Sequence, residues 1–248
     1  MILGQIINIL IKSKKPLKST LMHCIIPCRA GSKRIPRKAL ELFNGVPMLQ
    51  DAIEKAKSIN IIKNIFVSTD DTEFGDLATR CGAIFLPRSK ELSNDFIGVD
   101  QTLGEVSKDL IKKNLISLSD YVLTLFPCTP LLSSKSINQF CNEFLNKKFK
   151  TGLIISKYRH PIQRALSKTQ EGYITIDNEL AFEKRTQDLE EKFHDAGQCY
   201  LTEASTLING KLIDDKPYGY IDNDVLDIDN LDDLEFARKI IKIKWIFL

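Results

Sequence analysis

Compact apolar runs alternate with segments of helical periodicity along most of this chain, and that alternation limits the folds open to it. Between the apolar runs, amphipathic segments begin near Pro47, Asp71, Asp100 and Ser133. Repeated strand–helix units of this kind predict an α/β fold, a Rossmann-like αβα sandwich with a mostly parallel sheet. The strands of that sheet are expected at residues 24–27, 65–68, 83–86, 121–126 and 152–156.

The composition fits one sizeable globular domain. Of 248 residues, 43% are hydrophobic and 27% are charged, and 35 basic against 32 acidic residues leave a net charge of +3. A balance this even does not favour nucleic acid as the main partner. The six cysteines form no CxxC pair and mostly lie in apolar runs. This pattern predicts reduced thiols, a cytoplasmic location and no zinc site.

Two segments depart from the strand–helix pattern. In residues 1–21 an apolar run too short to span a membrane precedes the lysines, which reverses the order of a secretory signal. We therefore expect no membrane association and interpret residues 1–21 as an extension ahead of a natural start at Met22, with an amphipathic anchor as the alternative. The domain then covers residues 22–248, and the weak periodicity of residues 157–198 indicates an insertion into it.

Residues 29–38 carry five cations directly after the first expected strand. Their sequence, Arg-Ala-Gly-Ser-Lys-Arg-Ile-Pro-Arg-Lys, joins a glycine-containing turn, whose backbone N–H groups can surround phosphate oxygens, to side chains that neutralise phosphate charge. The spacing matches neither GxGxxG nor GxxxxGK[ST]. Because ligands of parallel sheets lie beyond the carboxyl ends of the strands, the loop predicts a triphosphate site. A solvated basic loop is the alternative.

Three further segments follow expected strands. In residues 68–71, Asp70 and Asp71 are candidates for capping the next helix, and contact of Asp70 with a nucleotide is the further possibility. Residues 126–130, with two prolines, form either a structural turn or a ligand contact. Asp227 and Asp229 lie on one side of residues 225–229 if that segment is a strand, and paired carboxylates facing phosphates are suited to Mg²⁺. Capping of the last helix is the alternative for Asp229.

The insertion contains the densest group of polar side chains. Its residues 185–198 read Arg-Thr-Gln-Asp-Leu-Glu-Glu-Lys-Phe-His-Asp-Ala-Gly-Gln. A solvated helix explains the first half. The donors and acceptors suited to a polyhydroxylated acid are Arg185, Gln187, His194, Asp195 and Gln198.

Five strings, in this order and spacing, resemble the acylneuraminate cytidylyltransferase family: IIPCRAGSKRIPRK, STDD, FPCTP, RTQDLEEKFHDAG and VLDIDNLDDLEFA. The resemblance covers nearly all of the chain from Met22 to Arg238, and the fourth string is similar to the branch that acts on pseudaminic acid. It implies a Mg²⁺-dependent enzyme that joins CTP to a nonulosonic acid and releases pyrophosphate. It also implies that the insertion is a projecting segment that forms a homodimer.

The resemblance assigns roles residue by residue. It implies that Arg29, Ser32 and Lys38 hold the triphosphate, with Lys33 and Arg34 assisting. Asp227 and Asp229 match the metal ligands, so Arg29, Lys38 and Asp227 are the expected catalytic residues. Arg185, Gln187 and Asp195 are expected to reach the sugar acid, often across the dimer interface, and no histidine base is required.

The chain leaves the family pattern at three positions. Ala30 replaces a glycine and Ala39 replaces an asparagine that contacts the nucleotide in relatives. Phe126 stands where enzymes for N-acetylneuraminate often carry glutamine, which disfavours that substrate. Three alternatives therefore stay open: legionaminate as the sugar acid, N-acetylneuraminate as the sugar acid, and a nucleotide-binding relative without activity.

Overall fold

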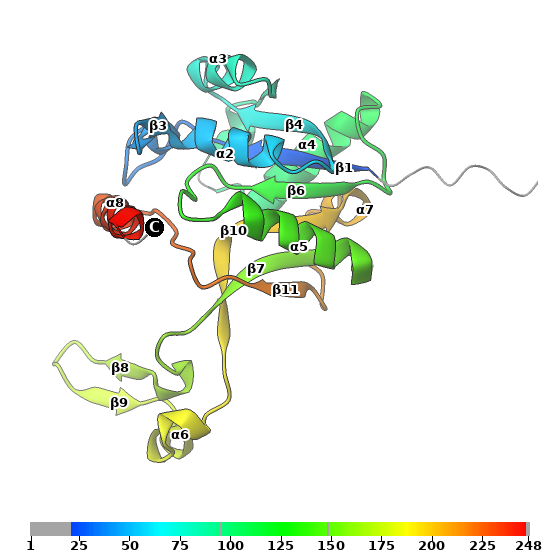
Figure 1. The fold of residues 1–248 in the computed structure, drawn as a ribbon. Coiled ribbons are helices and arrows are strands. Elements are labelled where there is room, and N and C mark those ends of the chain that lie inside the picture. Colours follow the sequence, from blue (N-terminus) through cyan, green and yellow to red (C-terminus); the bar gives the residue numbers. More distant parts are fainter. Residues whose placement is uncertain (1–20, 95, 148, 247–248) are drawn as a thin grey trace, which may run out of the picture.

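The structure is a computed structural model, and it describes residues 21–94, 96–147 and 149–246. Its centre is a seven-stranded sheet of order β11-β7-β10-β6-β1-β4-β5 (Figure 1). Six of these strands run parallel, and β10 is antiparallel to both of its neighbours. The strands are β1 (Met22–Pro27), β4 (Ile62–Thr69), β5 (Ile84–Pro87), β6 (Tyr121–Leu125), β7 (Thr151–Lys157), β10 (Phe193–Glu203) and β11 (Tyr218–Ile221).

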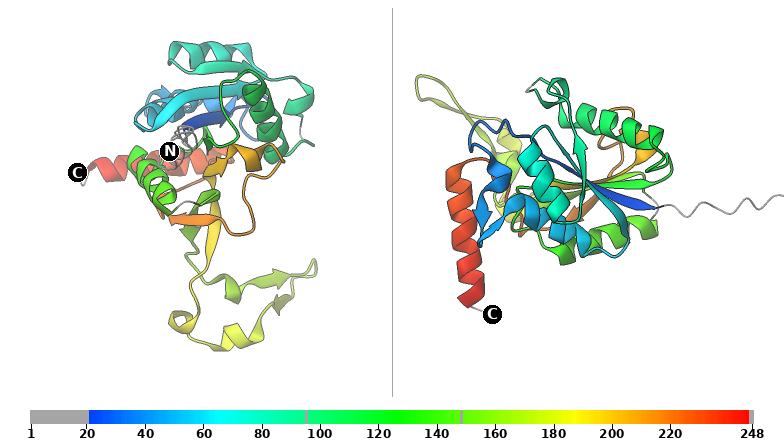
Figure 2. Two further views of the ribbon diagram at one scale, coloured as in Figure 1. Left: turned by 90° about the vertical axis from the view of Figure 1, so that its right-hand side faces the viewer. Right: turned by 90° about the horizontal axis from the view of Figure 1, so that it is seen from above.

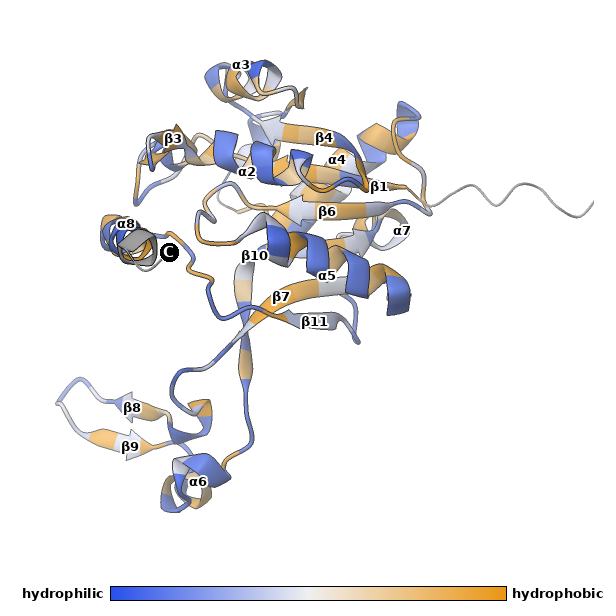
Figure 3. Ribbon diagram, in the orientation of Figure 1, coloured by the Kyte–Doolittle hydropathy of each residue, from blue (hydrophilic) through white to orange (hydrophobic). Residues whose placement is uncertain are grey.

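Helices cover both faces of the sheet, so the expected αβα sandwich is confirmed. One face packs against α2 (Met48–Lys57), α3 (Thr72–Arg80), α5 (Ser134–Lys147) and α8 (Leu231–Ile246), and the other against α4 (Val99–Lys112) and α7 (Ala204–Leu207). Each face of the sheet has its own hydrophobic core, and alternate residues of β1 point into them. Cys24 and Ile26 pack into the core beside α2, and Ile25 packs into the core beside α4. Figure 3 shows this apolar interior along the strands.

Local sequence signals set several element ends, as expected. The Asp71 side chain caps α3 by accepting from the backbone N–H groups of Glu73 and Phe74. Gly82 takes a φ of +82° just after the helix. Pro47 directly precedes α2 and closes the small hairpin of β2 (Leu42–Phe43) and β3 (Val46–Pro47). Short 3₁₀ turns lie at η1 (Lys38–Leu40) and η2 (Glu91–Ser93).

The prediction of a strand at residues 225–229 is wrong. The described structure has no strand there, and β11 takes the sheet edge instead, parallel to β7. Tyr218 stacks on Phe149 with ring centroids 4.9 Å apart. Aromatic packing favours β11 over a run rich in aspartate, which strands disfavour. Residues 225–229 instead cross to α8, anchored in the core by the fully buried Ile228.

A long segment, residues 158–192, projects from the sheet between β7 and β10 (Figures 1 and 2). We call it the arm. It contains η3 (Ile162–Arg164), the hairpin β8 (Leu166–Lys168) and β9 (Ile174–Ile176), α6 (Glu179–Glu183) and η4 (Thr186–Asp188). Residues 193–198, which the sequence pattern grouped with the insertion, belong to β10. The proposed extension falls almost wholly on residues 1–20, outside the described residues.

No helix in the described part of the chain is both long and apolar enough to cross a membrane.

The amino end of β1 holds a fully buried histidine, His23, and we expect it to make stability depend on pH. Its Nδ1 contacts Asn64 Nδ2 at 3.2 Å and its Nε2 lies 3.5 Å from Asp120 Oδ2. Burial lowers the pKa of His23, and Asp120 only partly opposes that shift. Below about pH 6.5 the unfolded chain therefore binds more protons, so the free energy of unfolding should fall by up to about 1.4 kcal/mol per pH unit.

Urea unfolding at pH 7.5, 6.5 and 5.5 measures this slope. Replacement of His23 by glutamine should flatten it, whereas the same replacement at the exposed His160 should leave it unchanged. Burial alone would raise the pKa of Asp120, but hydrogen bonds from Ser117 and Leu21 outweigh burial and lower it. The stability that the charged Asp120 contributes is therefore lost only in solutions more acidic than these. An equal slope in the wild type and the His23 variant would contradict the prediction.

Candidate functional site

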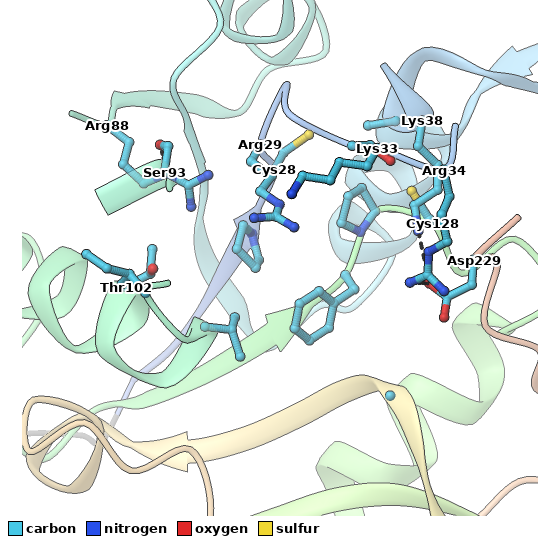
Figure 4. A pocket seen from close by; sticks show the side chains of 18 of the residues that line it. Cys28, Arg29, Lys33, Arg34, Lys38, Arg88, Ser93, Thr102, Cys128 and Asp229 are labelled. Carbon is cyan, nitrogen blue, oxygen red and sulfur yellow. Dashed lines mark hydrogen bonds and ion pairs between the residues drawn. The ribbon is translucent and has the colours of Figure 1, made fainter. Parts of the chain in front are cut away.

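A cavity of about 630 Å³ opens at the carboxyl ends of β1 and β6. The basic loop after β1 forms one wall, the turn after β6 a second, and Arg88 with residues 92–94 and 97–102 a third (Figure 4). Seven of the predicted site residues line it: Arg29, Ser32, Lys33, Arg34, Lys38, Asp227 and Asp229. The structure thus brings the predicted triphosphate loop and the predicted metal ligands to one space.

The basic loop is held by a few specific contacts. The backbone N–H of Ala30 donates to Asp70 Oδ1 at 3.1 Å, and Ile35 is buried beneath the loop. Arg37 has a φ of +53° and turns away to α3, where it pairs with Asp71 and Glu73. Four of the five cations therefore line the cavity, and the fifth fastens the loop to the protein.

Asp70 lies behind the loop and does not line the cavity. Besides Ala30, its carboxylate lies 3.9 Å from the Arg88 guanidinium. The capping role belongs to Asp71. Asp70 therefore supports the loop, and direct nucleotide contact by it stays a prediction.

Two cations of the loop contact the segment that carries Asp227 and Asp229. Arg34 Nη2 lies 2.8 Å from Asp229 Oδ1, the contact drawn in Figure 4. Lys38 Nζ donates to the carbonyl of Ile228 at 2.5 Å and lies 3.6 Å from Asp229. The charges of the loop and of Asp229 therefore offset each other across the cavity.

The surroundings of Asp227 disfavour its charged form. Burial first, and then the like charge of Asp229, raises its pKa, while Lys38 and Arg34 oppose the shift. Gly197, whose φ of +67° favours glycine, lies beside it: a Cβ there would be in ordinary contact with Asp227 Oδ2, at 3.4 Å. A cation beside Asp227 would relieve both causes of the shift.

Helix capping does not explain the acidic pair. Asn230 Oδ1 accepts from the N–H of Asp233, and Asp233 Oδ2 accepts from the N–H groups of Asp229 and Asn230. This reciprocal arrangement caps α8 and leaves the side chains of Asp227 and Asp229 facing the cavity. Among the described residues no group of three or more His, Cys, Asp or Glu could hold a metal. Two carboxylates suit Mg²⁺ nonetheless, because that ion fills its remaining positions with water and phosphate oxygens.

Sequence reasoning missed the third wall of the cavity. Arg88 follows β5, its side chain is 5% exposed, and its Nε donates to Ser93 Oγ at 2.9 Å. Thr102 faces the same end of the cavity, away from Arg34 and Asp229 in Figure 4. The rule that sites lie after strands would have found Arg88, had it been applied to β5.

The four residues predicted to bind the sugar acid do not line this cavity. Arg185 and Gln187 lie on the arm, where Arg185 pairs with Asp188 at 2.8 Å. Asp195 accepts from the hydroxyl of Tyr200 at 2.6 Å. Gln198 is fully buried and neither polar atom of its side chain has a hydrogen-bond partner. Substrate contact by these four residues stays a prediction.

The sequence of the chain is similar to those of known cytidylyltransferases. The sequence profile of the family described as Cytidylyltransferase matches residues 23–209. The chain is 33% identical to the pseudaminic acid cytidylyltransferase of Campylobacter jejuni, over 89% of this chain and 96% of that protein. It is 28% identical to the N-acylneuraminate cytidylyltransferase of Streptococcus agalactiae, over 85% of this chain and 51% of that protein.

Solved structures share the fold at low identity. CMP:2-keto-3-deoxy-manno-octonic acid synthetase, solved with CTP, superposes with a TM-score of 0.67 at 15% identity, covering 91% of this chain and 100% of that one. A 4-diphosphocytidyl-2C-methyl-D-erythritol synthase gives 0.66 at 14% identity, covering 90% and 99%. At such identities the likeness supports the αβα architecture alone.

Proposed function

This chain belongs to the cytidylyltransferase family and is thus an enzyme of the nucleotidyltransferase type, and we propose that it joins CTP to pseudaminic acid. The products are the CMP-activated sugar acid and pyrophosphate. One observation carries the proposal: a loop with four cations faces Asp227 and Asp229 across a single cavity. Such a cavity suits a polyanion and a divalent cation together.

The basic loop provides the charge stabilisation in this proposal. Arg29, Lys33 and Lys38 neutralise the triphosphate, and the Ser32 hydroxyl, which also lines the cavity, offers a donor for its oxygens. The anomeric hydroxyl of the sugar acid attacks the α-phosphorus in line, and pyrophosphate leaves into the cationic wall. Positioning and charge compensation do most of the work in reactions of this kind.

Asp227 and Asp229 are proposed to hold Mg²⁺. When bound, the ion would offset the phosphate charge and acidify the attacking hydroxyl. Arg34 and Lys38 already contact the segment that carries these carboxylates, so nucleotide binding and the placement of the acidic pair are linked through the same side chains.

Pseudaminic acid is the proposed acceptor for two reasons. Relatives from Campylobacter jejuni and Helicobacter pylori are named for it, at 33% and 30% identity over 89% and 73% of this chain. Phe126, which lines the cavity, offers an apolar ring where enzymes for N-acetylneuraminate often carry an amide. Legionaminate and N-acetylneuraminate are the competing acceptors.

Pyrophosphate release from CTP, measured with a panel of free sugar acids, tests the acceptor. We expect kcat/KM to be highest with pseudaminate and at least about tenfold lower with N-acetylneuraminate, the discrimination that one or two altered polar contacts provide. A higher value with legionaminate or N-acetylneuraminate would contradict the assignment of the acceptor but not the reaction type.

We also propose that the arm forms a homodimer and brings Arg185 and Gln187 to the partner's cavity, with Asp195 reaching the sugar acid from the start of β10, next to the arm. The arm carries exposed large hydrophobic residues, including Tyr173, which is 74% exposed, and Leu180, which is 77% exposed. In the hairpin, Leu166 lies opposite Ile176, so both share one face with Ile174. Exposed apolar surface of this kind is typical of an interface.

Charge on that face should separate the dimer. We expect the wild type to behave as a dimer in sedimentation analysis and the Ile174→Glu variant to behave as a monomer with slower transfer. Thr175→Glu, on the opposite face of β9, is the matched control and should stay dimeric. A monomeric wild type, or a dimeric Ile174→Glu, would contradict this use of the arm.

A further inference from the structure

A buried lysine lies behind the cavity wall that follows β6. Lys55 is on α2, whose other inward side chains are apolar, and only 9% of it is exposed. Lysine is almost never buried unless its charge is paired, because removing an ammonium from water is costly. The position therefore calls for specific partners.

Lys55 has one partner for each of its three N–H donors. Its Nζ donates to the backbone carbonyls of Thr129 and Pro130, each at 3.1 Å. It also lies 2.6 Å from Asp51 Oδ2, one turn earlier on α2. Three donors meeting three acceptors satisfy the ammonium completely. The result is a direct tie from α2 to the turn after β6.

That turn is buried over residues 127–130 and is tied to β10 by the N–H of Phe126, which donates to the carbonyl of Gln198 at 2.9 Å. Pro127 and Pro130 have no N–H to donate. Within the turn, Thr129 Oγ1 donates to the carbonyl of Phe126 at 3.0 Å, and the N–H of Leu132 donates to the carbonyl of Thr129 at 3.2 Å. The two contacts from Lys55 add hydrogen bonds to the carbonyls of Thr129 and Pro130, and they join the turn to α2.

The front of the same turn is a wall of the cavity. Phe126, Pro127 and Cys128 line it, and the Phe126 ring meets Tyr200 edge-on with centroids 6.0 Å apart. We propose that Lys55 is a positioning residue for the transfer reaction: it holds this wall where the two substrates meet. The inference rests on the proposed function and adds a residue that touches neither substrate.

The test is Lys55→Met, which keeps the length of the buried side chain and removes the ammonium. Lys57→Met is the matched control, because Lys57 lies on the same helix but is exposed and pairs with Glu54. We expect Lys55→Met to lower kcat for pyrophosphate release about tenfold or more per folded molecule, since misplaced reacting groups are costly. Lys57→Met should stay within about twofold of the wild type.

Hydrogen exchange of the intact protein supplies a second measurement that needs no substrate. In Lys55→Met the amides of Cys128, Thr129, Leu131 and Leu132 should exchange about tenfold faster, because charge-assisted hydrogen bonds to the turn are lost. Exchange in β1 should not change. Unchanged exchange in the turn would overturn the proposal, as would a normal kcat per folded molecule in an active enzyme.

The two proposals can fail separately. If the wild type releases no pyrophosphate with any sugar acid, the proposed function fails, and the exchange measurement alone decides whether Lys55 holds the turn. If the wild type is active and Lys55→Met is less stable but equally active per folded molecule, Lys55 serves stability only. That outcome refutes the positioning role and leaves the proposed function intact.

Discussion

Replacing Asp227 with asparagine should lower kcat for pyrophosphate release about 10³-fold, the scale seen when one preorganised electrostatic contact is removed. The variant keeps the shape of the side chain beside Gly197 and removes the charge that is proposed to hold Mg²⁺. Because burial and Asp229 already raise the pKa of Asp227, the neutral amide should leave the fold at least as stable. Initial rates with saturating CTP and Mg²⁺ measure the effect.

Asp232→Asn is the matched control for that experiment. Asp232 lies in the exposed first turn of α8, five residues from Asp227, and does not line the cavity. Its rate should stay within about twofold of the wild type. A folded Asp227→Asn variant that retains a tenth or more of the wild-type rate would contradict the role given to the acidic pair.

Replacing Lys38 with methionine should weaken CTP binding about 30-fold. The ammonium is expected to meet the triphosphate, and it already fixes the carbonyl of Ile228 next to Asp229. Charge-assisted hydrogen bonds contribute about 1.5–3 kcal/mol each, which corresponds to factors of roughly 10 to 150 in affinity. Titration calorimetry with CTP and Mg²⁺, without acceptor, measures this loss.

Arg37→Gln is the control within the same loop. Arg37 turns away from the cavity to Asp71, Glu73 and the Phe74 ring, so its loss should reduce stability more than CTP affinity. Equal losses of CTP affinity at positions 37 and 38 would show that net positive charge, and not the placement of Lys38, governs binding.

The parts of this protein that local pattern determines could be predicted from the sequence. The continuous apolar run of β1, which is buried throughout, the cap at Asp71 and the cations directly after β1 depend on neighbours in sequence, and they led to the correct sheet and to the basic loop. Asp227 and Asp229 reached the cavity as predicted, although not from a strand. Their placement comes from Ile228, which is buried in the core.

The parts that depend on distant contacts could not be predicted. β11 forms at the sheet edge because Tyr218 and Tyr220 pack on Phe140, about 80 residues earlier in the chain. Lys55 reads as an ordinary helix-surface lysine until the turn after β6 is placed beside it. Charged side chains acquire such roles through tertiary partners, which periodicity does not reveal.

The most direct test of the central claim is a single reaction containing the purified protein, CTP, Mg²⁺ and pseudaminic acid, with pyrophosphate and the nucleotide product both quantified. We predict one pyrophosphate for each CMP-linked sugar acid formed, and neither product when the sugar acid is omitted. Tight CTP binding without pyrophosphate release for any nonulosonic acid would contradict the account and leave a nucleotide-binding protein without transferase activity.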